Sequence, residues 1–114
     1  MKSLAQPNRQ LAARVLSEVA FEDRLVGYRL RKRMGPVAVH LYSLEEVARF
    51  LSQDLPQLDW SSLREWVGDR LDDPELAAAV QEIADQDLGE HEKALRVRAL
   101  LGIRLDQCRK VVST

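Results

Sequence analysis

The sequence lacks the long apolar runs that mark membrane spans and secretion signals. Its longest apolar stretches, "VAV" at residues 37–39 and "LAAAV" at 76–80, are far shorter than the roughly 20 residues that cross a bilayer. The polar residues 8–10 interrupt the N-terminal segment where a signal peptide would have its apolar region. We therefore expect neither a membrane-spanning helix nor a signal peptide.

Cysteine, histidine and glycine are also scarce. Cys108 is the single cysteine and cannot form an intramolecular disulfide, which predicts a reducing compartment and hence a cytoplasmic protein. His91 has no second histidine four residues later, as a zinc protease would require, and the only other histidine is His40. The five glycines are scattered, so no glycine-rich phosphate loop is present. We expect no metal, no cofactor and no catalytic residue, and thus a protein that is not an enzyme.

Two further groups of reactive side chains have structural explanations. Asp69, Asp72 and Asp73 form the densest acidic set, but they fall where one predicted helix ends and the next is capped. Cys108 lies on a predicted apolar stripe, which favours a core or interface residue over a nucleophile.

Charge is segregated along a chain whose net charge is only -1. Every charge at residues 24–33 is positive, residues 45–92 are mainly acidic, and residues 93–110 are mainly basic. With 114 residues, 46% of them hydrophobic, the chain is predicted to fold as one globular domain spanning residues 1–114. Complementary blocks of this kind can pair within one fold or between chains.

Helix signals recur along most of the chain. A first helix follows Pro7-Asn8, and Ser43 with Glu46 forms a capping box for a second. A short helix capped by Ser61 or Ser62 follows, and Asp73-Pro74-Glu75 is a strong start for the next. The last helix, about residues 90–112, is the longest.

The segment between residues 25 and 42 fits two templates. A helix could continue to Met34 and stop before Gly35-Pro36. Alternatively, apolar residues alternate as two strands around a turn, which predicts a β-hairpin; these residues are Val26, Tyr28, Leu30, Val37, Val39 and Leu41. The helix is slightly favoured, although Gly27 weakens it. The predicted fold is therefore mainly α, a compact bundle of four or five helices, with a short β-hairpin around residues 25–42 as the alternative.

The C-terminal helix carries a stripe that predicts a protein interface. Leu101, Leu105, Cys108 and Val112 are spaced four, three and four residues apart, as in helices that pack against a partner helix. The basic residues Arg98, Arg104, Arg109 and Lys110 flank the stripe and could meet the acidic block of a second chain. The competing interpretation is that the stripe closes the chain's own core.

The basic stretch suggests a second kind of partner. Arg29, Lys32 and Arg33 would share one helical face and could contact nucleic-acid phosphates. However, the chain is slightly acidic overall, and Tyr28 is the only aromatic side chain in this stretch that could stack on a base.

The order of several motifs resembles a family of small uncharacterised bacterial and archaeal proteins. The matching elements are Tyr28 with Leu30, the turn glycine Gly35, "SLEEV" at 43–47 and "EWVGDRLDDPELA" at 65–77. The chain departs from this pattern at "SQDLPQLDW", residues 52–60, where the family has a histidine-containing segment. The resemblance implies a small folded domain, favours the hairpin over the continuous helix, and supplies no activity.

The sequence thus predicts a small non-enzymatic interaction or regulatory module. It is expected to bind another protein or itself through its C-terminal helix. Nucleic-acid binding through residues 24–33 is the alternative.

Overall fold

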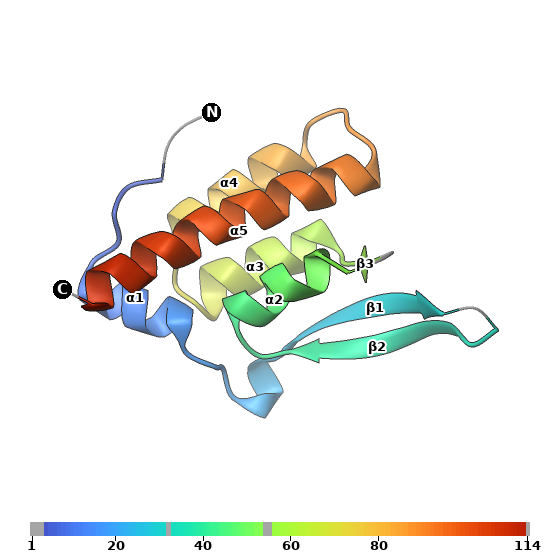
Figure 1. Ribbon diagram of the computed structural model, residues 1–114, viewed down its shortest axis with the longest axis horizontal. Helices are drawn as coiled ribbons and strands as arrows, with labels where there is room; N and C mark the ends of the chain where they lie inside the picture. Colours follow the sequence, from blue (N-terminus) through green and yellow to red (C-terminus); the bar gives the residue numbers. More distant parts are fainter. Residues whose placement is uncertain (1–3, 32, 54–55, 114) are drawn as a thin grey trace.

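The computed structural model describes residues 4–31, 33–53 and 56–113. Within these residues the chain forms five α-helices and a three-stranded antiparallel sheet (Figure 1). The helices are α1 Arg9–Leu16, α2 Leu44–Leu51, α3 Trp60–Asp69, α4 Pro74–Ala84 and α5 Glu90–Ser113. The strands are β1 Leu25–Arg31, β2 Gly35–Leu41 and β3 Pro56–Gln57, and a 3₁₀ turn, η1 Phe21–Asp23, precedes β1. None of the helices in the described residues is long and apolar enough to cross a membrane.

The predicted helical bundle is therefore wrong, because the segment for which a helix was slightly favoured forms a hairpin. β1 and β2 pair in register from Leu25 opposite Leu41 to Arg31 opposite Gly35. The period-two alternation of apolar residues decides the outcome, since it gives the hairpin one face that can be buried. The fold is helix-rich α/β, with the hairpin extending from the helical body (Figure 1).

Two glycines fit the hairpin rather than a helix. Gly35 has a φ of 70° at the end of the turn, a left-handed conformation that glycine adopts without strain. Gly27 allows β1 to lie against α2, because a Cβ atom there would stand 2.8 Å from Cζ of the buried Phe50 ring. The residue that weakened the helix prediction is therefore the one that lets β1 approach α2 closely.

The helix starts agree with the sequence signals at three of four places. Asn8 caps α1 by accepting a hydrogen bond from the Leu11 amide, as the Pro7-Asn8 start predicts. Ser43 Oγ accepts a hydrogen bond from the Glu46 amide, so the serine cap of α2 is confirmed. The Glu46 carboxylate accepts its bond from the Tyr42 amide, one residue before the cap residue whose amide a capping box would use. Asp73 caps α4 through the Leu76 amide, with Pro74 at the first helical position. The predicted serine cap of α3 is wrong: the helix begins at Trp60, with Asp59 at the N-cap position.

α5 crosses the body and packs against α1, α2 and α4 (Figure 1). Leu101, Leu105 and Cys108 on this helix are all buried in the chain's own core. Only Val112 of the four predicted interface residues is exposed, and Val111 takes its place in the core. Most of the stripe therefore closes the chain's own core, as the competing interpretation predicted. The shorter helices need α5 to cover their apolar faces.

Arg104 was predicted to lie on the basic flank of the stripe, but its side chain is buried. Its guanidinium is 1% exposed and forms two hydrogen bonds with Asp73, 2.9 Å from Nε to Oδ2 and 3.1 Å from Nη2 to Oδ1. It also donates to Glu75 Oε1 at 3.0 Å and to the Ala5 carbonyl at 2.8 Å. This buried ionic cluster ties α5, the start of α4 and the N-terminal segment together within one chain.

Candidate functional site

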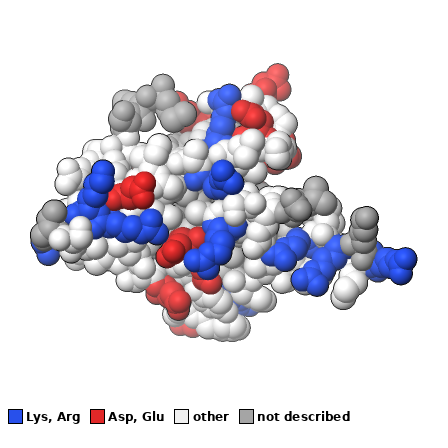
Figure 2. All heavy atoms as spheres, viewed as in Figure 1, with Lys and Arg blue, Asp and Glu red and all other residues white. Residues whose placement is uncertain are grey.

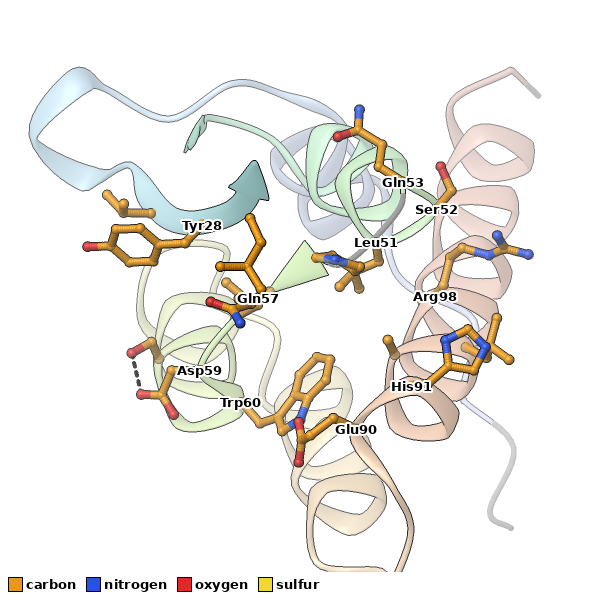
Figure 3. A pocket seen from close by; sticks show the side chains of 17 residues that line it. Tyr28, Leu51, Ser52, Gln53, Gln57, Asp59, Trp60, Glu90, His91 and Arg98 are labelled. Atoms are coloured by element: carbon orange, nitrogen blue, oxygen red, sulfur yellow. Dashed lines mark hydrogen bonds between the residues drawn. The ribbon is translucent and has the colours of Figure 1, made fainter. Parts of the chain in front are cut away.

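A groove lies between the sheet and the first turns of α5. Its volume is about 1050 Å³, at the upper end of the range for binding pockets. Figure 3 shows Tyr28 and Gln57 on one side of the open space, His91 and Arg98 of α5 on the other, and Leu51 and Trp60 between them. The hairpin, the end of α2, the segment 56–59, α3 and α5 each supply part of the lining.

The alternation of β1 places apolar side chains along one wall of the groove. Val26, Tyr28 and Leu30 are two residues apart and therefore point to the same face of the strand. Tyr28 is 46% exposed and Leu30 is 40% exposed. Leu95 on α5, 39% exposed, lines the same groove. These large apolar side chains remain in contact with water in the isolated chain, which is typical of a docking surface.

Two pairs of polar side chains in the groove lining are already hydrogen-bonded to each other. Trp60 Nε1 donates a hydrogen bond to Glu90 Oε2 at 2.9 Å, which joins α3 to the start of α5. Asp59 Oδ2 accepts one from Ser62 Oγ at 2.8 Å, the dashed contact in Figure 3. These contacts fix the indole and both carboxylates, so the floor of the groove is held in place without a ligand.

Arg98 and His91 differ from those groups. Within the described part of the chain, neither side chain has a hydrogen-bond or ion-pair partner. Both are exposed on the α5 wall: His91 is the second residue of the helix, and Arg98 lies about two turns further along it. The groove therefore combines an apolar lining with one guanidinium that is free to bind an anion.

The described side chains show no arrangement suited to metal binding. In residues 4–31, 33–53 and 56–113, no three His, Cys, Asp or Glu side chains gather closely enough to hold an ion. Cys108 is buried, and desolvation raises the pKa of its thiol. A raised thiol pKa disfavours the thiolate, the form that acts as a nucleophile.

The predicted nucleic-acid residues lie on the hairpin. Arg33 is exposed in the turn, and Figure 2 shows basic side chains gathered toward the hairpin end of the molecule. Arg29 is half-buried and its Nη2 donates a hydrogen bond to Gln53, while its Nε has no partner among the described atoms. Lys32 lies outside the described residues. Arg24, at the base of β1, is held by His40 Nδ1 and the Phe21 carbonyl.

Sequence reasoning missed the groove as a whole. It drew attention to Tyr28 as a base-stacking residue and to Arg98 as a flank of the C-terminal stripe. It had no reason to join them, because residues 28 and 98 are 70 positions apart. The available signal was local: Leu95 and Arg98 are three residues apart, so they share a helical face outside the main apolar stripe.

Comparisons with protein-family models, with curated proteins and with solved structures find no match to this chain. The groove and the hairpin are therefore interpreted from their own chemistry.

Proposed function

We propose that this protein is a non-enzymatic interaction module that binds an extended peptide segment of a partner protein in the groove. The observation that carries the proposal is the groove itself, where exposed Tyr28, Leu30 and Leu95 stand opposite or beside an unpaired Arg98. The C-terminal helix still takes part, but through its first turns rather than through its buried stripe.

The composition of the groove favours a protein partner. Tyrosine, tryptophan and arginine are the residue types enriched where protein interfaces concentrate their binding energy, and the groove contains Tyr28, Trp60 and Arg98. The apolar wall of β1 suits aliphatic or aromatic side chains of the peptide. Arg98 suits an aspartate, a glutamate or a C-terminal carboxylate next to them.

Selection from a library of random peptides on the immobilised protein tests the proposal. We expect the enriched sequences to combine two or more large apolar residues with an acidic residue. Arg98→Glu should weaken a selected peptide by about tenfold or more, because charge reversal removes the attraction and adds repulsion. Fluorescence of Trp60 provides the titration signal.

Lys110→Glu is the matched control. Lys110 is also exposed on α5, and it lies outside the groove. The same change of charge there should leave the affinity within about a factor of two. Equal loss in both variants, or enriched peptides without apolar residues, would contradict the proposal.

Nucleic-acid binding remains the second candidate, because the hairpin projects from the body and carries Arg31 and Arg33 near its tip (Figure 1). A two-stranded ribbon of this kind can enter the major groove of DNA. Against it, Arg29 is engaged by Gln53, and Tyr28 points to the opposite face of β1 from Arg29 and Arg31. The hairpin therefore does not present its aromatic and basic residues together.

We expect only weak, salt-sensitive binding of oligonucleotides, in the micromolar range typical of nonspecific contacts. A titration of single- and double-stranded oligonucleotides at physiological salt measures this. Nanomolar affinity that falls on Arg31→Glu would make nucleic acid the first candidate.

We also propose that the module acts in the cytoplasm. A free, buried cysteine is compatible with a reducing compartment.

A further inference from the structure

One side of α5 faces away from the helices that it covers. Six residues on this side are spaced four, three, four, three and four positions apart, so they share one helical face. We call this face the outer seam; it consists of Glu92, Arg96, Ala99, Ile103, Asp106 and Lys110. Glu92 is partly exposed and the other five are exposed. Figure 1 shows α5 running across the molecule in front of α4.

The outer seam has the spacing of a helix that packs lengthwise against another helix. The buried residues of α5, such as Val97, Leu101 and Cys108, lie on the opposite side and close the chain's own core. Packing against α1, α2 and α4 therefore uses one face of α5. The outer seam is a second face, which the described part of the chain leaves in contact with solvent.

The charges of the outer seam are arranged symmetrically about its centre. An acid and then a base, Glu92 and Arg96, precede the uncharged residues, and an acid and then a base, Asp106 and Lys110, follow them. When the seam is laid antiparallel against itself, Glu92 of one copy lies opposite Lys110 of the other, and Arg96 lies opposite Asp106. Every charge of the seam therefore meets a charge of opposite sign.

We propose that two copies of this chain pair antiparallel along the outer seam, about a two-fold axis near residue 101. This register places Ala99 of one copy opposite Ile103 of the other and forms four ion pairs, two on each side of the centre. The partner is a second copy because the charge order of the seam is complementary to itself. A parallel pairing is excluded, since it would bring Glu92 against Glu92 and every other charge against its own kind.

The uncharged centre of the outer seam gives the two helices an apolar contact. Ile103 is 54% exposed in the single chain, and it would bury this surface against Ala99 of the second copy. Gly102 lies beside the seam, and a Cβ atom added to it would meet no described atom within 4 Å. Ala99 and Gly102 therefore present little bulk, which allows the two backbones to approach each other closely.

The seam charges keep the capacity for these contacts, although some of them already have partners in the chain. Arg96 Nε lies 3.2 Å from Glu92 Oε1, and Arg109 Nη1 lies 3.5 Å from Asp106 Oδ1. Each contact engages one of the two oxygens of a carboxylate, and the side chains of Glu92 and Asp106 are 47% and 72% exposed. Each carboxylate can therefore hold its own partner and also accept a hydrogen bond from a base of the second copy.

The outer seam and the groove share no residue. The residues of α5 that line the groove are His91, Ala94, Leu95 and Arg98. A dimer paired along the seam therefore keeps both grooves open. It binds a partner protein that carries two peptide segments more tightly than a single groove does.

The mass of the protein in solution tests the dimer. One pair of helices is a small interface, so we expect a monomer at low micromolar concentration and a doubled mass at high micromolar concentration, measured by sedimentation equilibrium. A single monomer mass throughout the range would overturn the proposal.

Ile103→Asp tests the centre of the seam. Ile103 is exposed, so the monomer should keep its fold, whereas the dimer would have to desolvate a carboxylate against Ala99. We expect this variant to remain monomeric at every concentration. Val112→Asp, the matched control at an exposed valine of α5 outside the seam, should dimerise like the unmodified protein. Dimerisation of the Ile103 variant, or equal loss in both variants, would contradict the proposal.

Two charge-reversed variants test the antiparallel register. In Glu92→Lys and in Lys110→Glu, positions 92 and 110 carry the same sign, so each variant should dimerise about tenfold more weakly than the unmodified protein. In an equimolar mixture, position 92 of each variant meets position 110 of the other with opposite sign, and the doubled mass should return. A mixture that stays monomeric where the unmodified protein dimerises would rule out this register.

Lys110→Glu also separates the dimer from the proposed groove, because Lys110 lies in the seam and outside the groove. This variant should weaken dimerisation and leave the affinity for a single peptide within about a factor of two. Unchanged dimerisation of this variant would contradict the dimer, whereas a loss of peptide affinity would count against the groove.

Discussion

Arg104→Met is expected to lower the free energy of unfolding by about 3–5 kcal/mol, because removing one partner of a buried ion pair leaves the other charge unpaired. Asp73 would keep its cap of α4 but lose both guanidinium hydrogen bonds in a site where its side chain is 1% exposed. Such a loss is a large part of the roughly 5–15 kcal/mol that stabilises a domain. Urea denaturation followed by circular dichroism measures the change.

Arg109→Met is the matched control on the same helix. Arg109 is about half exposed and pairs with Glu45 and Asp106 at 3.6 and 3.5 Å, so its loss should cost less than about 1 kcal/mol. If both variants unfold at the same urea concentration as the unmodified protein, the buried ionic cluster does not hold the three segments together.

Leu105→Asp is expected to unfold the chain at 25 °C. Leu105 is buried in the core that α5 closes, and an unpaired carboxylate there costs several kcal/mol in addition to the lost apolar contacts. Circular dichroism should show loss of most helical signal, and the protein should be degraded rapidly by trypsin.

Val112→Asp separates the two uses of the C-terminal stripe. Val112 belongs to the same predicted stripe but is 40% exposed, so this variant should fold with little loss of stability. A folded, monomeric Leu105→Asp variant would instead mean that the stripe forms an interface between chains.

The sequence contained the signals for the hairpin, but local helix preference competed with them. Alternation over residues 26–30 and 37–41 is the pattern of paired strands, and Gly35 has the conformation that the turn requires. What the sequence could not show is the reason for Gly27. Position 27 requires glycine because the ring of Phe50 leaves no room for a Cβ atom there. Phe50 is 23 positions later in the sequence, and only the fold brings its ring against β1.

The burial of Arg104 could have been predicted from its spacing. It lies three residues after Leu101 and four before Cys108, a position that falls on the buried face of α5. The sequence also predicted that a helix starts at Asp73. The contact between the two residues could not be predicted, because pairing residues 31 positions apart depends on how α4 and α5 pack.

The groove was the least predictable part of the molecule. Helix starts and apolar stripes are local patterns, whereas the groove is assembled from β1, the residues around β3, and the first turns of α3 and α5. Each contributes one to a few side chains that have ordinary explanations by themselves. Only the folded chain brings the exposed apolar residues of β1 close to the unpaired Arg98 of α5.

The two tryptophans allow one measurement to test the proposed groove directly. Trp60 Nε1 donates to Glu90 inside the groove at 2.9 Å, and Trp66 Nε1 donates to the Asp23 carbonyl outside it at 2.7 Å. Each indole N–H gives its own signal in a ¹H–¹⁵N NMR spectrum. When a selected peptide is titrated, we expect the Trp60 signal to shift until saturation and the Trp66 signal to stay in place. A peptide that binds while the Trp60 signal remains unmoved would contradict the assignment of the groove as the binding site.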